Sequence, residues 1–180
     1  GRDHQFPPHK VPYRANVHAM RTLGVDRIVG PTAVGSLQPN FEPGQFAVPD
    51  QIVDRTWGRE FTFYDGPEVE HLSFADPYHP AMRTIALDGM RATGATVHDG
   101  GAVVVIQGPR FSTRAESEWF SSLGWELINM TQIPEASLSG EAGIPYVNIS
   151  VITDYDAGVV GGTPVTHEEV IKRFGESSAT

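Results

Sequence analysis

The chain has 180 residues, which is long enough for one domain with a hydrophobic core, and 39% of them are hydrophobic. Thirteen Lys and Arg against 22 Asp and Glu give a net charge of −9 with no basic stripe, so we expect no nucleic-acid partner. The absence of cysteine excludes disulfides, thiolate metal sites and cysteine nucleophiles, and it fits a cytoplasmic protein. No stretch approaches the ~18 apolar residues of a membrane helix, so we expect no membrane partner.

Strand and helix patterns alternate along the chain. After a polar, Pro-rich segment over 1–10, the expected elements are a helix over 13–23 that ends at Gly24, strands over 26–33 and 46–53, a long loop over 56–74, a helix over 76–92, a strand over 97–107, a loop over 108–113, a helix over 114–123, a strand over 126–130, a helix over 134–142, a strand over 146–153, a glycine-rich loop over 157–163 and a helix over 165–174. The run Ala102-Val-Val-Val-Ile106 is typical of a strand buried on both faces. This order predicts a single α/β domain over 1–180, with a mixed, mainly parallel central sheet flanked by helices.

Two carboxylates, Asp154 and Asp156, follow the apolar run 145–152. Side chains alternate along a strand, so both lie on one face, ~7 Å apart at about 3.3 Å per residue. Such a pair at the carboxyl end of a parallel strand lies where open α/β sheets bind ligands, and crowding raises the proton affinity of at least one carboxylate, as a general acid requires. An Asp-x-Asp pair is also the metal-nucleotide signature of many glycosyltransferases. The seven histidines show no paired ligand spacing, so we expect no metal site.

Small and hydrogen-bonding residues mark two further predicted strand ends, Thr32-Ala33 and Asn129-Met130-Thr131. Hydroxyl and backbone N–H groups in these places could bind an oxyanion in the same crevice. Taken alone, each threonine is explained better by its preference for strands than by a role in binding.

Several segments, in order and with fitting spacing, resemble the trimeric purine nucleoside phosphorylase family, and within it the S-methyl-5′-thioadenosine phosphorylases. They are Pro31-Thr-Ala-Val-Gly-Ser-Leu37, Gly108-Pro-Arg-Phe-Ser-Thr-Arg-Ala-Glu-Ser117, Asn129-Met-Thr-Gln-Ile-Pro-Glu135 and Thr153-Asp-Tyr-Asp156, with Gly1-Arg-Asp-His4 as a fitting start. The resemblance implies a nucleoside phosphorylase fold and phosphorolysis of 5′-deoxy-5′-methylthioadenosine, or another 5′-variant adenosine, to adenine and a pentose 1-phosphate. Inorganic phosphate would be the co-substrate, with no cofactor.

The resemblance also implies roles for single residues. Asp154 matches the catalytic partner of purine N7, and Asp156 faces the 6-amino group. Thr32, Ala33 and Thr131 match phosphate-binding positions. Among the remaining implied substrate contacts, Met130 contacts the ribose, Phe111 forms the wall against the base and Ser112 tunes substrate choice, with Asn129 as a further contact. His71 would reach a neighbouring subunit's site, so a homotrimer or a hexamer is expected. By themselves, Phe111 would be read as a core residue and His71 as a surface histidine.

Two departures from the family pattern leave alternatives open. Where the thioadenosine enzymes place a small apolar residue against the methylthio group, this chain has His167, which could donate to a 5′-hydroxyl or be a solvated residue at a helix start. The family's first strand, Gly-rich phosphate loop and Arg-His pair would precede Gly1, so we expect the chain to be incomplete at both ends of a longer protein. The rivals are a broader purine nucleoside phosphorylase that accepts adenosine or 6-oxopurine nucleosides, a hydrolase, and an inactive purine-binding fragment.

Overall fold

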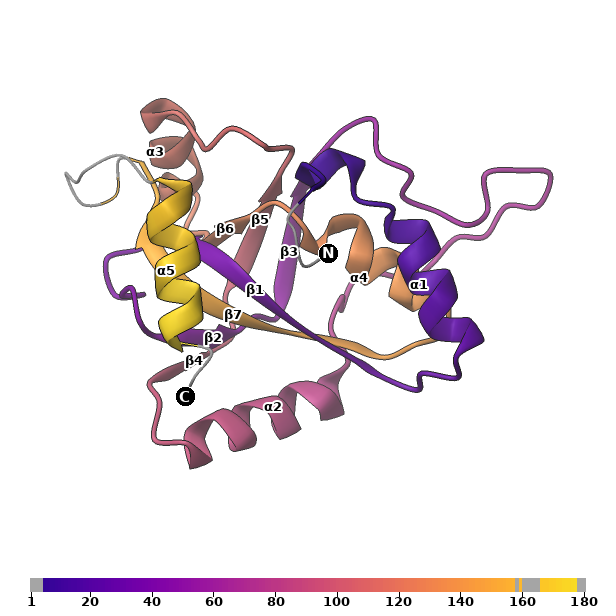
Figure 1. Cartoon of the computed structure of the whole chain (residues 1–180), viewed down its shortest axis with the longest axis horizontal. Coiled ribbons are helices and arrows are strands. Elements are labelled where there is room, and N and C mark those ends of the chain that lie inside the picture. Colours follow the sequence, from indigo (N-terminus) through magenta and orange to yellow (C-terminus); the bar gives the residue numbers. More distant parts are fainter. Residues whose placement is uncertain (1–4, 158, 160–165, 178–180) are drawn as a thin grey trace.

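The computed structural model describes residues 5–157, 159 and 166–177, and it forms one curled sheet with helices packed around it (Figure 1). In chain order the elements are η1 (Pro8–Lys10), α1 (Tyr13–Thr22), β1 (Ile28–Ser36), β2 (Phe46–Val48), β3 (Gln51–Arg55), α2 (Pro80–Ala92), β4 (Val97–Asp99), β5 (Ala102–Ile106), α3 (Arg114–Ser122), β6 (Leu127–Asn129), α4 (Gln132–Glu141), β7 (Tyr146–Tyr155) and α5 (His167–Ser177). In the described part of the chain, none of these helices is both long and apolar enough to cross a membrane.

The strand order is β3-β5-β6-β1-β7-β2-β4. Four pairs are parallel, namely β1–β7, β2–β4, β3–β5 and β5–β6, whereas β1–β6 and β2–β7 are antiparallel. The longest pairing joins β1 to β7 in the middle of the sheet, along all nine residues of β1. The predicted α/β class with a mixed, mainly parallel sheet is confirmed.

Two predicted strands were wrong, because each is divided by a sharp bend. The strand expected over 46–53 is β2 and β3, and the strand expected over 97–107 is β4 and β5. At the bend, Asp50 Oδ1 accepts a hydrogen bond of 3.0 Å from the N–H of Gly101, and Gly100 and Gly101 have φ values of 98° and 113°. Glycine adopts such φ values without a Cβ clash, so the two-stranded ribbon can turn there from one end of the sheet to the other.

The core lies on both faces of the sheet. Val103, Val104 and Val105 of β5 are fully buried, and their neighbours differ: Val103 and Val105 pack with Ile133, whereas Val104 packs with Phe120 of α3. The prediction of a strand buried on both faces is therefore confirmed. Helices α2 and α5 pack on β7, and α1 packs on α4 (Figure 1).

Some boundaries differ from those expected. Strand β1 continues to Ser36, three residues beyond its predicted end, because β7 pairs with it throughout. Helix α2 begins at Pro80 rather than at residue 76, with the His79 side chain accepting from the N–H of Met82. The predicted glycine-rich loop over 157–163 falls largely outside the described residues.

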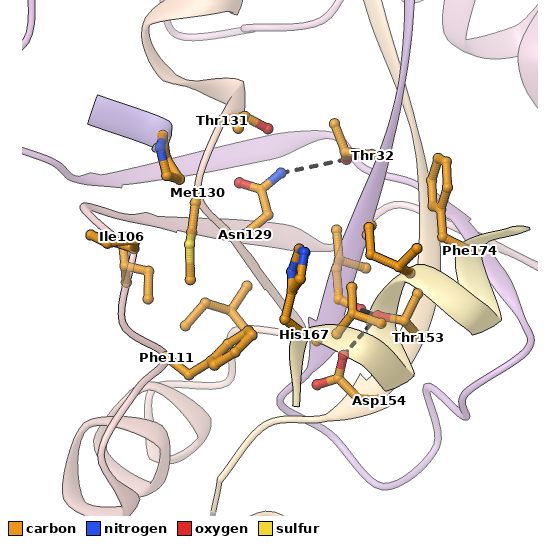
Figure 2. A pocket seen from close by; sticks show the side chains of 18 of the residues that line it. Thr32, Ile106, Phe111, Asn129, Met130, Thr131, Thr153, Asp154, His167 and Phe174 are labelled. Carbon is orange, nitrogen blue, oxygen red and sulfur yellow. Dashed lines mark hydrogen bonds between the residues drawn. The ribbon is translucent and has the colours of Figure 1, made fainter. Parts of the chain in front are cut away.

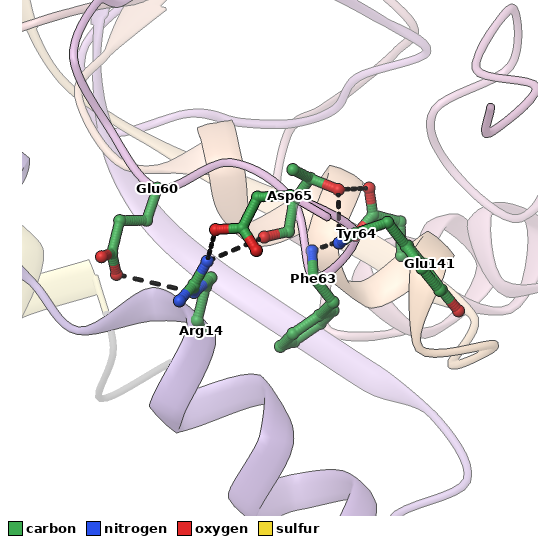
Figure 3. Close-up of polar contacts among 7 residues, drawn as sticks. Arg14, Glu60, Phe63, Tyr64, Asp65 and Glu141 are labelled. Carbon is green, nitrogen blue, oxygen red and sulfur yellow. Dashed lines mark hydrogen bonds and ion pairs between the residues drawn. The ribbon is translucent and has the colours of Figure 1, made fainter. Parts of the chain in front are cut away.

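The segment over 56–79 forms no helix or strand, as expected for its part over 56–74, yet it is fixed by side chains of two helices (Figure 3). Arg14 of α1 donates to Asp65 Oδ2 at 2.7 Å and to the carbonyl of Thr62 at 3.2 Å. Glu141 of α4 accepts from the Thr62 hydroxyl and from the N–H of Phe63, both at 2.7 Å. This long loop is therefore tied to α1 and α4.

Candidate active site

A cavity of about 700 Å³ opens beside the central strands and gathers most of the predicted site residues (Figure 2). The predicted residues that line it are Thr32, Ala33, Phe111, Ser112, Asn129, Met130, Thr131, Asp154, Asp156 and His167. His71 is exposed on the 56–79 loop and does not line this cavity. Its expected place at a neighbouring subunit's site stays a prediction.

The cavity forms where β6 and β1 separate. On its β1 side, strand β6 pairs at Gly35 and Ser36 and no further. It ends at Asn129 and leads through Met130 and Thr131 into α4. Thr32 and Ala33 lie inside β1 and not at its end as predicted, since β7 keeps β1 extended. They nevertheless face the opening, because β6 has already diverged from β1 at their level.

The two aspartates approach β1 at Gly35. A Cβ atom at this position would lie 3.0 Å from Asp154 Oδ1 and 3.5 Å from Asp156 Cβ, so a larger residue would crowd both side chains. Both carboxylates therefore lie on the same face of the strand, as the alternation of side chains predicts.

Burial raises the pKa of Asp154 from 3.8 to about 6, and the neighbouring Asp156 carboxylate adds to the rise. The Thr153 hydroxyl works against both, because it donates to Asp154 Oδ2 at 2.7 Å and so favours the ionised form. The same hydroxyl lies 3.2 Å from the carbonyl of Val34, but it has one proton, and the shorter contact takes it. Asp154 can thus exist as an acid near neutral pH.

Asp156 is 5% exposed, and burial raises its pKa as well. The hydroxyls of Ser112 and Ser117 lie near enough to oppose that rise, yet Asp156 Oδ2 has no hydrogen-bond partner within the described residues. A buried acceptor without a partner at a cavity wall is suited to an N–H donor on a ligand.

The loop before α3 holds the aromatic wall of the cavity. Arg110 donates to both carboxylate oxygens of Glu116, at 2.7 and 2.8 Å, and Glu116 also accepts from the N–H of Thr113 at 2.7 Å. The hydrogen bond from Arg110 is the main cause that lowers the pKa of Glu116 to about 2. This capping box fixes the loop that carries Phe111 and Ser112.

Arg59 holds two walls of the cavity from behind and is 7% exposed. Its five N–H groups donate to the side chain of Gln107 and to four backbone carbonyls, those of Ile106, Gln107, Met130 and Ile133, at 2.5 to 3.3 Å. The end of β5 and the turn from β6 into α4 are therefore fixed to one guanidinium.

The mouth of the cavity is bordered by α5. His167, at the first position of the helix, points into the cavity between Met130 and Asp154 (Figure 2). Val170, Ile171 and Phe174 of the same helix also line the cavity, whereas His167 itself is exposed. Within the described residues, no three His, Asp or Glu side chains are grouped as metal ligands would be.

A family model described as the phosphorylase superfamily matches residues 3–180. The chain belongs to this superfamily. It is 53% identical to an S-methyl-5′-thioadenosine phosphorylase of Mycobacterium tuberculosis, over 98% of this chain and 65% of the relative. It is 48% identical to the S-methyl-5′-thioadenosine phosphorylase of Thermococcus kodakarensis, over 99% of this chain and 68% of the relative. It thus spans about two thirds of the length of these relatives.

Other matches widen the range of substrates among the relatives. A purine nucleoside phosphorylase of Streptomyces coelicolor is 46% identical over 97% of this chain and 65% of the relative. A solved structure, a variant of the adenosine/methylthioadenosine phosphorylase of Schistosoma mansoni in complex with adenine, superposes with a TM-score of 0.95 at 37% identity, over 99% of this chain and 71% of that one. These similarities confirm the predicted resemblance to the methylthioadenosine phosphorylases. By family, the chain is a nucleoside phosphorylase.

The sequence reasoning missed the buried polar residues that position the site of this phosphorylase. They include Arg59 and Asn148, the second being an amide inside the otherwise apolar run of β7. A buried polar residue in a central strand needs partners, so the position of Asn148 was a usable signal. The arginine gave no such signal, because its neighbours along the chain form no helix or strand pattern.

Proposed function

We propose that the protein carrying this chain cleaves 5′-deoxy-5′-methylthioadenosine, or an adenosine with another 5′ group, using inorganic phosphate. The bond between N9 of the purine and C1′ of the sugar breaks, and a bond between C1′ and a phosphate oxygen forms. The products are adenine and a pentose 1-phosphate, and no cofactor takes part. The proposal depends above all on Asp154, a half-buried carboxyl group that lines the cavity beside Asp156 and has a pKa of about 6.

In this proposal Asp154 supplies a proton or a strong hydrogen bond to N7, so that the purine leaves as a neutral base. Asp156 accepts from the 6-amino group, which fits the unpartnered Oδ2. Phe111 contacts the face of the base, Ser112 lies at its edge beside Asp156, and Met130 with Asn129 contacts the ribose. A carboxylate acceptor at position 156 favours adenine over 6-oxopurines.

Phosphate is proposed to bind at Thr32, Ala33 and Thr131, below the sugar. No Lys or Arg belongs to the described residues that line the cavity, so these residues offer phosphate only hydroxyl and amide groups. Such neutral donors bind anions when they are held in place.

His167 is proposed to set the preference at the 5′ carbon. An imidazole can donate to a 5′-hydroxyl, whereas it gains little from a thioether. We expect His167→Val to lower kcat/KM for adenosine relative to methylthioadenosine by about tenfold, as the loss of one such hydrogen bond implies. An unchanged ratio of the two kcat/KM values would remove His167 from the specificity site.

Assembly and location complete the proposal. We propose a homotrimer in which His71 of one subunit approaches the 5′ end of the substrate in its neighbour, and a cytoplasmic location. The exposure of His71 on a loop that is tied down supports the first proposal, and the absence of cysteine supports the second. Light scattering and the activity of His71→Ala would test the trimer and the shared site.

The decisive experiment measures release of the free purine base with and without phosphate: adenine from methylthioadenosine and adenosine, and hypoxanthine from their two 6-oxo counterparts. Phosphate-dependent release from the 6-amino nucleosides alone supports the proposal. Release without phosphate would indicate a hydrolase, and no release would indicate a purine-binding protein. Cleavage of 6-oxo substrates would favour the broader purine nucleoside phosphorylase, which the Streptomyces coelicolor relative makes the second candidate.

A further inference from the structure

A buried cluster of amide and hydroxyl groups lies behind Thr32. Asn148 and Ser150 of β7 are both fully buried, and they pair in register with Gly30 and Thr32 of β1. Asn148 Nδ2 lies 2.6 Å from the carbonyl oxygen of Gly30 and 3.0 Å from Thr32 Oγ1. The Ser150 hydroxyl donates to Asn148 Oδ1 at 2.7 Å.

The orientation of the Asn148 amide is fixed by these contacts. A backbone carbonyl oxygen can only accept, so the atom of Asn148 that approaches Gly30 must be the nitrogen. Ser150 donates to the opposite end of the amide, which supports the same orientation. The nitrogen that faces Thr32 is therefore a donor.

Two further amide nitrogens lie at the limit of hydrogen-bonding distance from Thr32 Oγ1 and compete for its second acceptor position. The side-chain nitrogens of Asn129 and Gln132 each lie 3.4 Å from it. A hydroxyl has two acceptor positions and one proton, and an amide nitrogen cannot accept that proton. With its acceptor side directed at amides, the hydroxyl has its proton available for the cavity that Thr32 lines.

We infer that Asn148 is a positioning residue, which orients the Thr32 hydroxyl as a donor to the anionic co-substrate. This inference rests on the proposed function, in which Thr32 binds phosphate. Without the amides, the hydroxyl could turn its proton to the carbonyl of Gly30 or to other acceptors, and phosphate would meet a lone pair. Hydrogen bonds in such a chain strengthen one another, so a donating Asn148 also makes the Thr32 proton a better donor.

The test is a double-mutant cycle on the full protein, with KM measured separately for phosphate and for the nucleoside. We expect Thr32→Val to raise the KM for phosphate about tenfold, as the loss of a hydrogen bond to a charged group implies. Asn148→Ala should raise it about threefold to tenfold and change the nucleoside KM by less than about twofold. In the Thr32→Val background, Asn148→Ala should have no further effect on the phosphate KM, because it acts only through the hydroxyl.

Ser139→Ala is the matched control, because it removes another fully buried hydroxyl, which donates to the Glu135 carbonyl at 2.7 Å. It should leave the phosphate KM unchanged.

If Asn148→Ala does not fold, Gln132→Met removes another amide that faces Thr32, and it can replace Asn148→Ala in the same cycle. Calorimetric titration with inorganic phosphate gives a second readout that needs no turnover. An additive cycle, or an equal rise of both KM values, would overturn the inference. An inactive wild type that still binds phosphate, with the cycle intact in the titration, would instead contradict the proposed function alone.

Discussion

Replacing Asp154 by Asn is expected to stabilise the fold while it removes the chemistry. In the folded protein the pKa of Asp154 is raised from 3.8 to about 6, mainly by burial. Between these values the folded state binds more protons than the unfolded state, so this group makes the protein less stable as pH rises through that window. The cost is complete above pH 6 and amounts to about 3 kcal/mol for a shift of roughly two pH units.

An amide cannot ionise, so Asp154→Asn does not carry this cost. Urea unfolding should give a free energy of unfolding about 3 kcal/mol higher than wild type at pH 8, but only about 0.5 kcal/mol higher at pH 4, where the folded carboxyl is already protonated. Phosphorolysis should fall by about 10² to 10⁴, the usual contribution of a general acid. Asp88→Asn, on the exposed side of α2, should shift the unfolding free energy by less than about 0.5 kcal/mol at either pH. A gain that is absent at pH 8, or equal at both pH values, would refute the reasoning.

Two more substitutions test the groups around the cavity. Thr153→Val removes the hydroxyl that favours ionised Asp154, so the pKa of that carboxyl should rise further, and kcat/KM should decline at a pH about one unit higher than in the wild type. Thr153→Ser keeps a hydroxyl and should keep the wild-type pH profile. A profile that valine leaves unchanged would contradict this role of Thr153. Arg59→Lys leaves only three N–H donors for the same acceptors, so we expect the free energy of unfolding to drop by about 2 kcal/mol or more and kcat/KM to fall at least about tenfold. The exposed Arg55→Lys serves as its control, and equal effects of the two substitutions would show that the carbonyl contacts of Arg59 do not matter.

The sequence predicted those features that depend on a local period. The alternation of side chains predicted that Asp154 in β7 and Asp156 just beyond its end approach the same side of β1, and the apolar run of β5 indicated burial on both faces. The bend at Asp50 and Gly101 was missed because the apolar pattern continues on both sides of it, and only pairing with distant strands shows where each half belongs. Thr32 was placed at a strand end because its small neighbours resemble a loop, whereas β7 holds them extended.

The site shows the same division. The residues that line the cavity belong to segments that are recognisable in the sequence, and ten of the predicted site residues line it. Arg59 and Asn148 act through contacts with residues tens of positions away, such as Met130 and Gly30, and no local pattern encodes such pairs.

The bend at Asp50 and Gly101 also affects how the protein unfolds. Strands β2 and β4 lie at one end of the sheet and β3 and β5 at the other, yet β3 follows β2 and β5 follows β4 in the chain directly across this bend. The pairing of β2 with β4 and that of β3 with β5 each join residues about fifty positions apart, so both ends of the sheet depend on the same two chain segments. We therefore expect the two ends of the sheet to unfold together. Because residues of β5, β6, β1 and β7 line the cavity, the loss of this pairing would also disrupt the site.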